Sequence, residues 1–313
     1  MKGQALPPLA ALAIMVWMCG NSALASPAPQ TKERTKLDAD INAIGNRRIA
    51  RGVNFYSVQY EKELGKSLAD EIERSSKLVE DPAVIEYIQR VAQNVANHSD
   101  AGMPITVRVV DNDAVDAFTL AGGYQYVSRG LLLRLESEAE LASVLARGIA
   151  HTALRSATTQ ASKSQLIAAS TVPVLASGPR SSSNSQTLTV SLIQLKMKRD
   201  DELDADYFGI QYVYKAGYDP ECFTNFLQRI WDSNATSATD GVSTVFGTYP
   251  PLDERLAALR KEISKILPSR DGAIVSTPEF DAFKGHLRAQ KPEGLDQPQK
   301  GTQPTHTYLD PIG

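Results

Sequence analysis

Residues 137–151 have the sequence SEAELASVLARGIAH, a strongly apolar helical pattern. Ser137 and Glu140 form a capping box, which is typical of the first turn of a helix. Most of the residues that follow are apolar, so we expect this helix to be buried. Arg147 and His151 are four residues apart and therefore share one face of it.

A second helix is predicted over about residues 189–216. It carries the sequence ELDAD at residues 202–206, in which Glu202 and Asp206 share a face. Taken alone, such a run is more typical of an exposed acidic face than of a buried site. Likewise, a lone His151 is more often a hydrogen-bonded helix histidine than a metal ligand.

Cap residues and hydrophobic periodicity predict the remaining elements. Helices are expected to begin near Ser57, Asp81, Asp219 and Leu252, with a strand over residues 104–111 and a hairpin over residues 117–127.

The composition is that of an acidic, folded chain. Its 313 residues include 33 Lys and Arg against 36 Asp and Glu, for a formal net charge of −3. A hydrophobic content of 42% and a charged content of 22% exclude wholesale disorder and a polytopic membrane protein. The negative charge argues against a nucleic-acid partner. The four histidines are far apart in sequence, so a site with several histidines would need distant parts of the chain.

Residues 1–25 are predicted to be a cleavable secretory signal. Lys2 gives a positive start, the apolar run at residues 9–19 is too short to span a bilayer, and ALA at residues 23–25 is a cleavage pattern. An uncleaved anchor is the less favoured alternative. We therefore expect a secreted or periplasmic protein with no transmembrane span in the mature chain. Cleavage would leave Cys222 without an intramolecular disulfide partner.

Residues 138–151 resemble the active-site helix of the HtpX-like zinc metallopeptidases, especially their exported, periplasmic branch. Members of this family carry H-E-x-x-H on that helix and E-x-x-x-D on a later one. Other segments match the family in the same order: Ala117-Phe118 with Gly122-Gly123, AGYDP at residues 216–220, and the prolines at 250–251 ahead of Glu254-Arg255. The resemblance covers about residues 41–267. It implies an α+β fold, mostly helical and zincin-like, with a small antiparallel sheet.

The resemblance and the composition together divide the chain. A polar lead-in at residues 26–52 is followed by a metallopeptidase-like domain at residues 53–267 and a C-terminal extension at residues 268–289. Residues 290–313 are rich in Gln, Pro, Gly and Thr and are predicted to be a disordered tail.

The H-E-x-x-H motif has a simple chemical basis. Two neutral imidazoles one helical turn apart bind Zn²⁺, a carboxylate from elsewhere is the third ligand, and the Glu takes a proton from the zinc-bound water. The resemblance assigns the second histidine ligand to His151, the carboxylate ligand to Glu202 and a ligand-orienting role to Asp206. It assigns the first histidine position to Arg147 and the general-base position to Gly148.

These last two residues depart severely from the family pattern. Arginine stays protonated and offers a metal no lone pair, and glycine has no side chain with which to move a proton. Loss of general-base catalysis alone lowers a rate by about 10²–10⁴-fold. Ser156, Asp116, Ala121 and Tyr249 are further departures, although Tyr249 can still donate a hydrogen bond to an oxyanion.

The leading expectation is an exported metallopeptidase homologue that is catalytically defective and binds polypeptide, or an envelope protein, rather than cutting it. The family cleft lies beside an edge strand, here near residues 118–127, and such an edge can accept an extended peptide by strand addition. Zinc is expected to be absent or weakly bound. The residues expected to contact the polypeptide are Asp116, Ala117, Phe118, Gly122 and Gly123.

Two other interpretations remain open at this stage. One is an active zinc metalloendopeptidase that uses His151, Glu202, Asp206 and water as ligands. The other is a structural or assembly partner in the envelope that does not use the cleft. The leading interpretation makes one structural prediction of its own: an ion pair between Arg147 and Glu202, shared with Asp206, replaces the metal as the link between the two helices.

Overall fold

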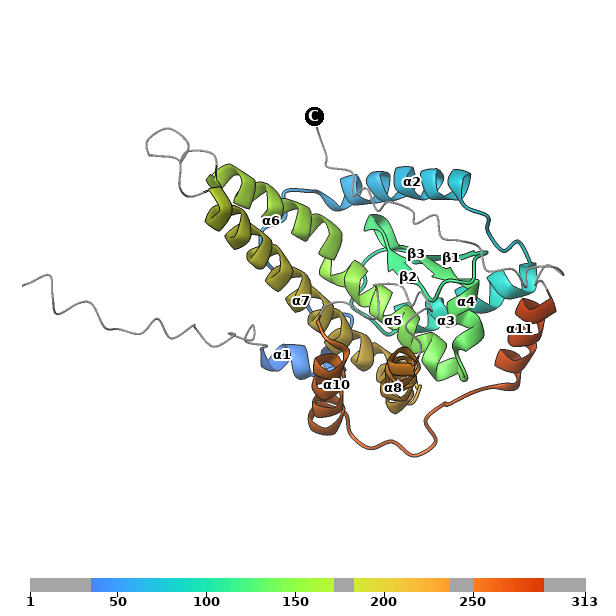
Figure 1. Cartoon of the computed structure of the whole chain (residues 1–313). Helices are drawn as coiled ribbons and strands as arrows, with labels where there is room; N and C mark the ends of the chain where they lie inside the picture. Colours follow the sequence, from blue (N-terminus) through green and yellow to red (C-terminus); the bar gives the residue numbers. More distant parts are fainter. Residues whose placement is uncertain (1–34, 172–182, 237–249, 290–313) are drawn as a thin grey trace, which may run out of the picture. The chain divides into compact units, whose positions relative to one another are not determined.

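The structure, a computed structural model, describes residues 35–171, 183–236 and 250–289 (Figure 1). The contacts divide the chain into two units, Met1–Thr35 and Lys36–Gly313, and the elements below belong to the second unit. The predicted signal peptide at residues 1–25, the tail at residues 290–313 and Tyr249 lie outside the described residues. The helices are α1 (Lys36–Ala39), η1 (Ile41–Ala43), α2 (Val58–Ser75), α3 (Pro82–Asn97), η2 (Ala121–Gly123), α4 (Arg129–Arg134), α5 (Glu138–Leu154), α6 (Ser156–Thr171), α7 (Ser183–Lys215), α8 (Glu221–Thr236), α10 (Leu252–Ile266) and α11 (Pro278–Ala289).

Helices α2, α3 and α5 begin at the expected cap residues, whose side chains accept hydrogen bonds from backbone N–H groups of the first turn. The hydroxyl of Ser57 accepts a hydrogen bond from the Tyr60 N–H, and the carboxylate of Asp81 accepts one from the Ala83 N–H. Ser137 caps α5 in the same way, through the N–H of Glu140. The Glu140 carboxylate accepts from the N–H of residue 136 rather than from that of Ser137, so the capping box is only half formed.

In the part of the chain that the structure describes, the sheet has three strands in the order β1-β3-β2: β1 (Thr106–Val110), β2 (Ala117–Thr119) and β3 (Tyr124–Ser128). β2 and β3 form the predicted antiparallel hairpin, but β1 and β3 are parallel. The expectation of a wholly antiparallel sheet is therefore wrong, although the α+β class is confirmed. The chain reverses once between β1 and β2 and again at the hairpin, so β3 runs in the same direction as β1 when it pairs beside it.

Gly122 and Gly123 shape the hairpin turn. Their φ angles are +75° and +87°, which favour glycine. A β-carbon at Gly123 would lie 2.2 Å from the carbonyl oxygen of Pro104, and one at Gly122 would lie 2.9 Å from the carbonyl oxygen of Glu61. Both glycines are therefore required by close backbone packing.

The central element is α5, which contacts α3, α7, α8 and β2. Figure 1 shows the sheet between α2 on one side and α5 on the other. Almost every side chain of α5 is buried, as the apolar sequence predicted; His151 and Ala153 are partly exposed. A helix buried on several faces fixes the position of any polar side chain that it carries.

Helical structure extends further than the sequence indicated. α6 covers a Ser- and Thr-rich stretch, and α7 begins at Ser183 rather than near residue 189. The two helices lie side by side in Figure 1. α11, which the sequence did not predict, inserts Phe280, Phe283 and Leu287 into the same core.

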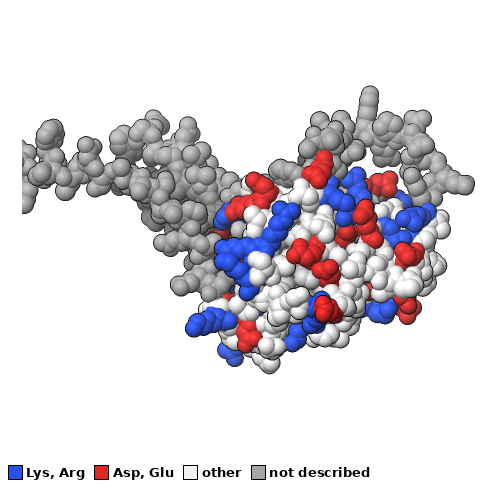
Figure 2. All heavy atoms as spheres, turned by 90° about the horizontal axis from the view of Figure 1, so that it is seen from below, with Lys and Arg blue, Asp and Glu red and all other residues white. Residues whose placement is uncertain are grey.

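Two observations concern the surface. On the face shown in Figure 2, Lys and Arg side chains are interspersed with Asp, Glu and neutral residues. Within the described residues, no helix combines the length and apolar character needed to cross a membrane.

Candidate functional site

The predicted site residues meet where α5 packs against α7. Arg147, Gly148 and His151 lie on α5, and Glu202 and Asp206 lie on α7. The helices approach closely because residue 209 is glycine: a β-carbon there would lie 3.2 Å from the backbone nitrogen of Arg147. Two sequence motifs about fifty residues apart therefore form one cluster.

The predicted ion pair between Arg147 and Glu202 is present. The Arg147 guanidinium contacts a Glu202 carboxylate oxygen, and its Nε lies 3.3 Å from Oδ1 of Asp206. The side chains of Arg147, Glu202 and Asp206 are 8%, 17% and 3% exposed. Such pairs are shielded from water, so their charges interact more strongly than a surface pair would.

A second arginine, which the sequence analysis did not assign to the site, completes the cluster. Arg255 on α10 donates from Nε and Nη2 to the two carboxylate oxygens of Asp206, at 2.6 and 2.8 Å. Arg255 and Asp206 are almost fully buried. Burial alone would raise the pKa of the Asp206 carboxyl, but Arg255 and Arg147 together hold it below its ordinary value.

His151 faces the same cluster but is not charged at neutral pH. Its Nε2 lies 3.8 Å from a Glu202 oxygen, and its Nδ1 lies 3.2 Å from the hydroxyl oxygen of Ser156. Burial, followed by the positive charge of Arg147, lowers the pKa of His151 to about 3. The imidazole is therefore neutral and able to accept a hydrogen bond.

The donors in this cluster do not match the zinc site that the resemblance implies. Burial and the nearby Arg255 lower the pKa of Arg147 to about 10, which still leaves the guanidinium protonated and without a lone pair at neutral pH. The Glu202 carboxylate is paired with this cation, and the Asp206 carboxylate is held by Arg255. Within the described ranges, no group of three or more His, Cys, Asp and Glu side chains is arranged to hold a metal ion.

The space beside Gly148 is filled by two polar side chains from the sheet. A β-carbon at Gly148 would lie 2.7 Å from both the Gln125 amide carbon and the Thr119 hydroxyl oxygen. Gln125, on β3, is 3% exposed. The sequence alone does not indicate Gln125 and Thr119, because only the packing of the hairpin against α5 brings them to Gly148.

The residues expected to contact polypeptide fall into two groups. Asp116, Ala117 and Phe118 lead into and form the edge strand β2, and the Phe118 ring stacks on Tyr126 with centroids 5.1 Å apart. Gly122 and Gly123 instead form the hairpin turn, where they pack against neighbouring backbone.

A buried carboxylate braces the end of α5. Arg155 adopts a left-handed conformation at the C-cap, with φ +54°. Its Nε donates to Glu61 Oε1 at 2.9 Å, and the Thr158 hydroxyl donates to the same oxygen. This contact ties α2 to the junction between α5 and α6, one turn beyond His151.

Comparison with known proteins supports the resemblance found in the sequence. Residues 82–263 match the model of peptidase family M48. The chain is 28% identical over 262 residues to the beta-barrel assembly-enhancing protease of Yersinia pestis, covering 79% of this chain and 54% of the relative. For the protein of the same name from Escherichia coli K12, the identity is 24% over 252 residues, covering 77% and 51%.

A more distant match is the mitochondrial metalloendopeptidase OMA1 of Arabidopsis thaliana, with 27% identity over 143 residues, or 46% of this chain and 29% of the relative. The chain spans about half the length of the beta-barrel assembly-enhancing proteases that it matches. The family model, in contrast, covers more than half of the chain. The protein therefore belongs to peptidase family M48, a family of zinc metallopeptidases.

Proposed function

We propose that this protein is an exported metallopeptidase homologue that does not cleave peptide bonds and instead holds polypeptide in a cleft beside β2. The observation that carries the proposal is the Arg147–Glu202 ion pair. It supports a site in which a protein cation has taken the place that the family gives to a metal ion. The predicted signal peptide at residues 1–25 supports a secreted or periplasmic location.

In this proposal the site lacks both metal binding and general-base catalysis. Arg147 cannot coordinate a metal, and its charge repels one from the remaining His151 and Glu202. Gly148 provides no proton acceptor, and the neighbouring Gln125 is an amide that is not basic at neutral pH. Loss of general-base catalysis alone corresponds to about 10²–10⁴-fold in rate.

The binding part of the proposal rests on the open edge of β2. Ser128 N–H donates to the Asp116 carbonyl, and Leu120 N–H donates to that of Tyr124. The ladder alternates along an antiparallel pair, so the main-chain groups of Ala117 and Thr119 point away from β3. An extended segment can add to those groups as a further strand.

The comparisons favour one class of partner. The relatives are named for enhancing the assembly of β-barrels. A segment of an envelope protein that has not yet formed its sheet would present extended main chain to β2. We therefore expect the cleft to bind unfolded or partly assembled envelope polypeptides, with a role in their quality control.

Metal analysis and a cleavage assay test the loss of chemistry together. After dialysis against a mild chelator at neutral pH, we expect less than stoichiometric zinc by mass spectrometry and no cleavage of β-casein. One tightly held zinc per chain with casein cleavage would favour the rival interpretation, an active enzyme with His151, Glu202 and Asp206 as ligands.

A substitution at the strand edge tests the binding role. Ala117→Pro removes an outward-pointing N–H at the first residue of β2, where proline is tolerated, whereas Ala117→Ser keeps that N–H. We expect Ala117→Pro alone to weaken binding of unfolded β-casein, measured by fluorescence anisotropy with circular dichroism as the check of folding. Equal binding by both variants would favour a structural or assembly partner that does not use the cleft.

A further inference from the structure

Exposed apolar side chains gather at one place on the protein. Among the residues whose side chains the structure describes, eight large apolar side chains are exposed. Five of the eight lie in α6, in the first turn of α2 and in the segment before it: Val53, Phe55, Val58, Tyr60 and Leu166. Proteins rarely leave such side chains grouped on the surface unless a partner covers them.

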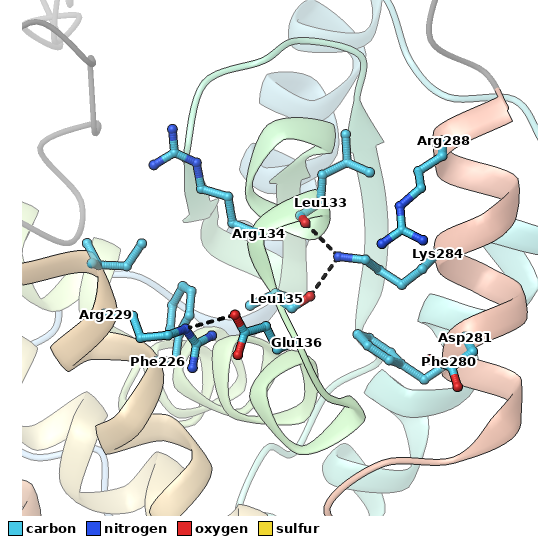
Figure 3. Close-up of a pocket in the computed structure, with 11 residues that line it drawn as sticks. Leu133, Arg134, Leu135, Glu136, Phe226, Arg229, Phe280, Asp281, Lys284 and Arg288 are labelled. Atoms are coloured by element: carbon cyan, nitrogen blue, oxygen red, sulfur yellow. Dashed lines mark hydrogen bonds and ion pairs between the residues drawn. The ribbon is translucent and has the colours of Figure 1, made fainter. Parts of the chain in front are cut away.

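The concavity in Figure 3, between the segment that joins α4 to α5, helix α8 and helix α11, offers no comparable surface. Its apolar lining includes Leu135, Phe226 and Phe280, which are each 1% exposed and belong to the core. Lys284 donates there to the carbonyl oxygens of Leu133 and Leu135, both at 2.6 Å. These side chains hold α11 against the fold, whereas those at α2 and α6 are accessible.

Contacts between α6 and the segment before α2 bring the exposed side chains together. The N–H of Phe55 donates to the Ser162 hydroxyl at 2.9 Å, and Leu166 lies one turn further along α6. The ring of Tyr56 stacks on that of Tyr60 with centroids 5.1 Å apart, and its hydroxyl accepts a hydrogen bond from a glutamine amide of α6 at 2.7 Å. We call the following five residues together the aromatic patch: Phe55, Tyr56, Val58, Tyr60 and Leu166.

The aromatic patch adjoins one end of the proposed cleft through the hairpin turn. The edge strand β2 ends at Thr119, and the turn that follows packs on the first part of α2. A β-carbon at Gly122 would lie 2.9 Å from the carbonyl oxygen of Glu61 and 3.0 Å from the α-carbon of Lys62. Tyr60 directly precedes these two residues, so the end of β2 leads to the patch.

The helix that packs against β2 leads to the same place. α5 contacts β2 and carries His151 one turn before its C-cap residue, Arg155. From there Arg155 donates through Nη2 to the carbonyl oxygen of Tyr56 at 2.6 Å. A polypeptide that pairs with β2 and continues past Thr119 therefore meets the rings of Tyr56 and Tyr60.

We propose that the aromatic patch binds aromatic side chains of the polypeptide whose main chain pairs with β2, an inference that rests on the proposed function of the cleft. Because β2 is three residues long, its edge offers few main-chain hydrogen bonds. In strand addition, side-chain contacts provide the selectivity. The exposed rings supply such contacts, since aromatic side chains stack and bury large apolar areas. The preferred ligand is thus an extended segment with aromatic side chains at alternate positions.

The test uses the full chain and two fluorescein-labelled peptides of about twelve residues, roughly 40 Å when extended. Tyr alternates with Thr in one peptide, and Ser replaces every Tyr in the other. By fluorescence anisotropy, the wild type should bind the Tyr peptide about tenfold more tightly than the Ser peptide, and Phe55→Ser/Tyr60→Ser should reduce this preference to less than about twofold. The control, Leu37→Ser/Val275→Ser, removes two exposed apolar side chains elsewhere and should keep the preference.

A second variant guards against a failure of Phe55→Ser/Tyr60→Ser to fold, which circular dichroism would detect. Val58→Ser/Leu166→Ser removes two exposed apolar side chains from the same patch and keeps the stacked pair of tyrosine rings. It should lower the preference for the Tyr peptide about threefold, because less apolar area is buried on binding.

Ala117→Pro separates the aromatic patch from the cleft. It should weaken the binding of both peptides by a similar factor and keep the preference for Tyr, since it acts on a main-chain donor. An unchanged preference in Phe55→Ser/Tyr60→Ser, with both peptides weakened by Ala117→Pro, would overturn the role of the patch alone. Peptide binding that Ala117→Pro does not change would contradict the proposed function and, with it, the continuity of patch and cleft.

Two other occupants of the patch would also overturn the assignment. Binding of phosphatidylglycerol vesicles that depends on Phe55 and Tyr60, without a preference for the Tyr peptide, would assign the patch to lipid. A dimer in solution that Phe55→Ser/Tyr60→Ser converts to a monomer would assign it to a second copy of the chain.

Discussion

Arg147 on α5 is paired with Glu202 on α7, and the adjacent Asp206 is held by Arg255 on α10. Two arginines and two carboxylates therefore link three helices at the position where the family pattern places a metal ion. A metal site and an ion-pair cluster both need groups from separate helices to face one another. The packing of α5 on α7 provides that arrangement, whichever group occupies the centre.

The Arg255–Asp206 pair should be essential for stability. Arg255→Met keeps a long side chain but leaves the Asp206 carboxylate without its bidentate partner in a buried place. Removing one partner of a buried pair costs about 3–5 kcal/mol, so the free energy of unfolding in urea should fall by that order. The exposed pair of Lys66 and Asp70 offers the control, since Lys66→Met should change the free energy of unfolding far less. A similar decrease in the free energy of unfolding in the two variants would show that the buried pair contributes no more to stability than the exposed pair.

Restoring the zinc motif should require more than two substitutions. Arg147→His with Gly148→Glu rebuilds H-E-x-x-H, but the new side chain at position 148 meets Gln125 and Thr119 at 2.7 Å. Overpacking of this kind costs about 1–3 kcal/mol. We expect the double variant to unfold at a lower temperature than the wild type, and the further change Gln125→Ala to recover part of that loss.

The triple variant should also bind zinc, because the histidine introduced at position 147 would complete the family's ligand set with His151 and Glu202. Cleavage of casein should return less fully, since Ser156 and Asp116 still depart from the family pattern. The measurement is zinc content after gel filtration, with Gly148→Glu/Gln125→Ala as the matched control that keeps Arg147. A triple variant that folds but takes up no zinc would show that Glu202 is not at a ligand position.

Lys284 should make stability depend on pH in the alkaline range. Its burial, followed by the charge of Arg288, lowers the pKa from 10.5 to about 8. Between these values the unfolded chain binds more protons than the folded chain, so the free energy of unfolding gains a contribution that rises with pH from about 8 to 10.5. Lys284→Met should lack this contribution, whereas Lys261→Met, at an exposed position, should retain it. If the free energy of unfolding depended on pH in the same way in the wild type and in Lys284→Met, the lowered pKa of Lys284 would be contradicted.

The sequence predicted the features that depend on local order. Ser137 marks the start of α5, and the spacing of Arg147 and His151 places them on one face. From the family resemblance we expect Glu202 to face these two residues. The first two need only the geometry of a helix, whereas the orientation of Glu202 comes from the family resemblance and not from local order. The Arg147–Glu202 pair could therefore be predicted before the fold was known.

Features that depend on the meeting of distant elements could not be predicted in this way. Arg255 reaches Asp206 only because α10 packs on α7, and Gln125 reaches Gly148 only because the hairpin of β2 and β3 packs against α5 through β2 and its turn. The parallel pairing of β1 with β3 has the same origin, since periodicity identifies a strand but not its neighbour. α11 was missed because its apolar residues are few and become informative only once they are seen in the core.

The central claim is that Arg147 and Glu202 together replace the metal bridge, and a double-mutant cycle in urea tests it most directly. Arg147→Ala should lower the free energy of unfolding by about 3–5 kcal/mol because it leaves a buried carboxylate unpaired. Arg147→Ala with Glu202→Gln should recover part of that loss, which gives a coupling energy well above the limit of about 0.5 kcal/mol for independent sites. A coupling energy below that limit, with both variants folded, would contradict the account.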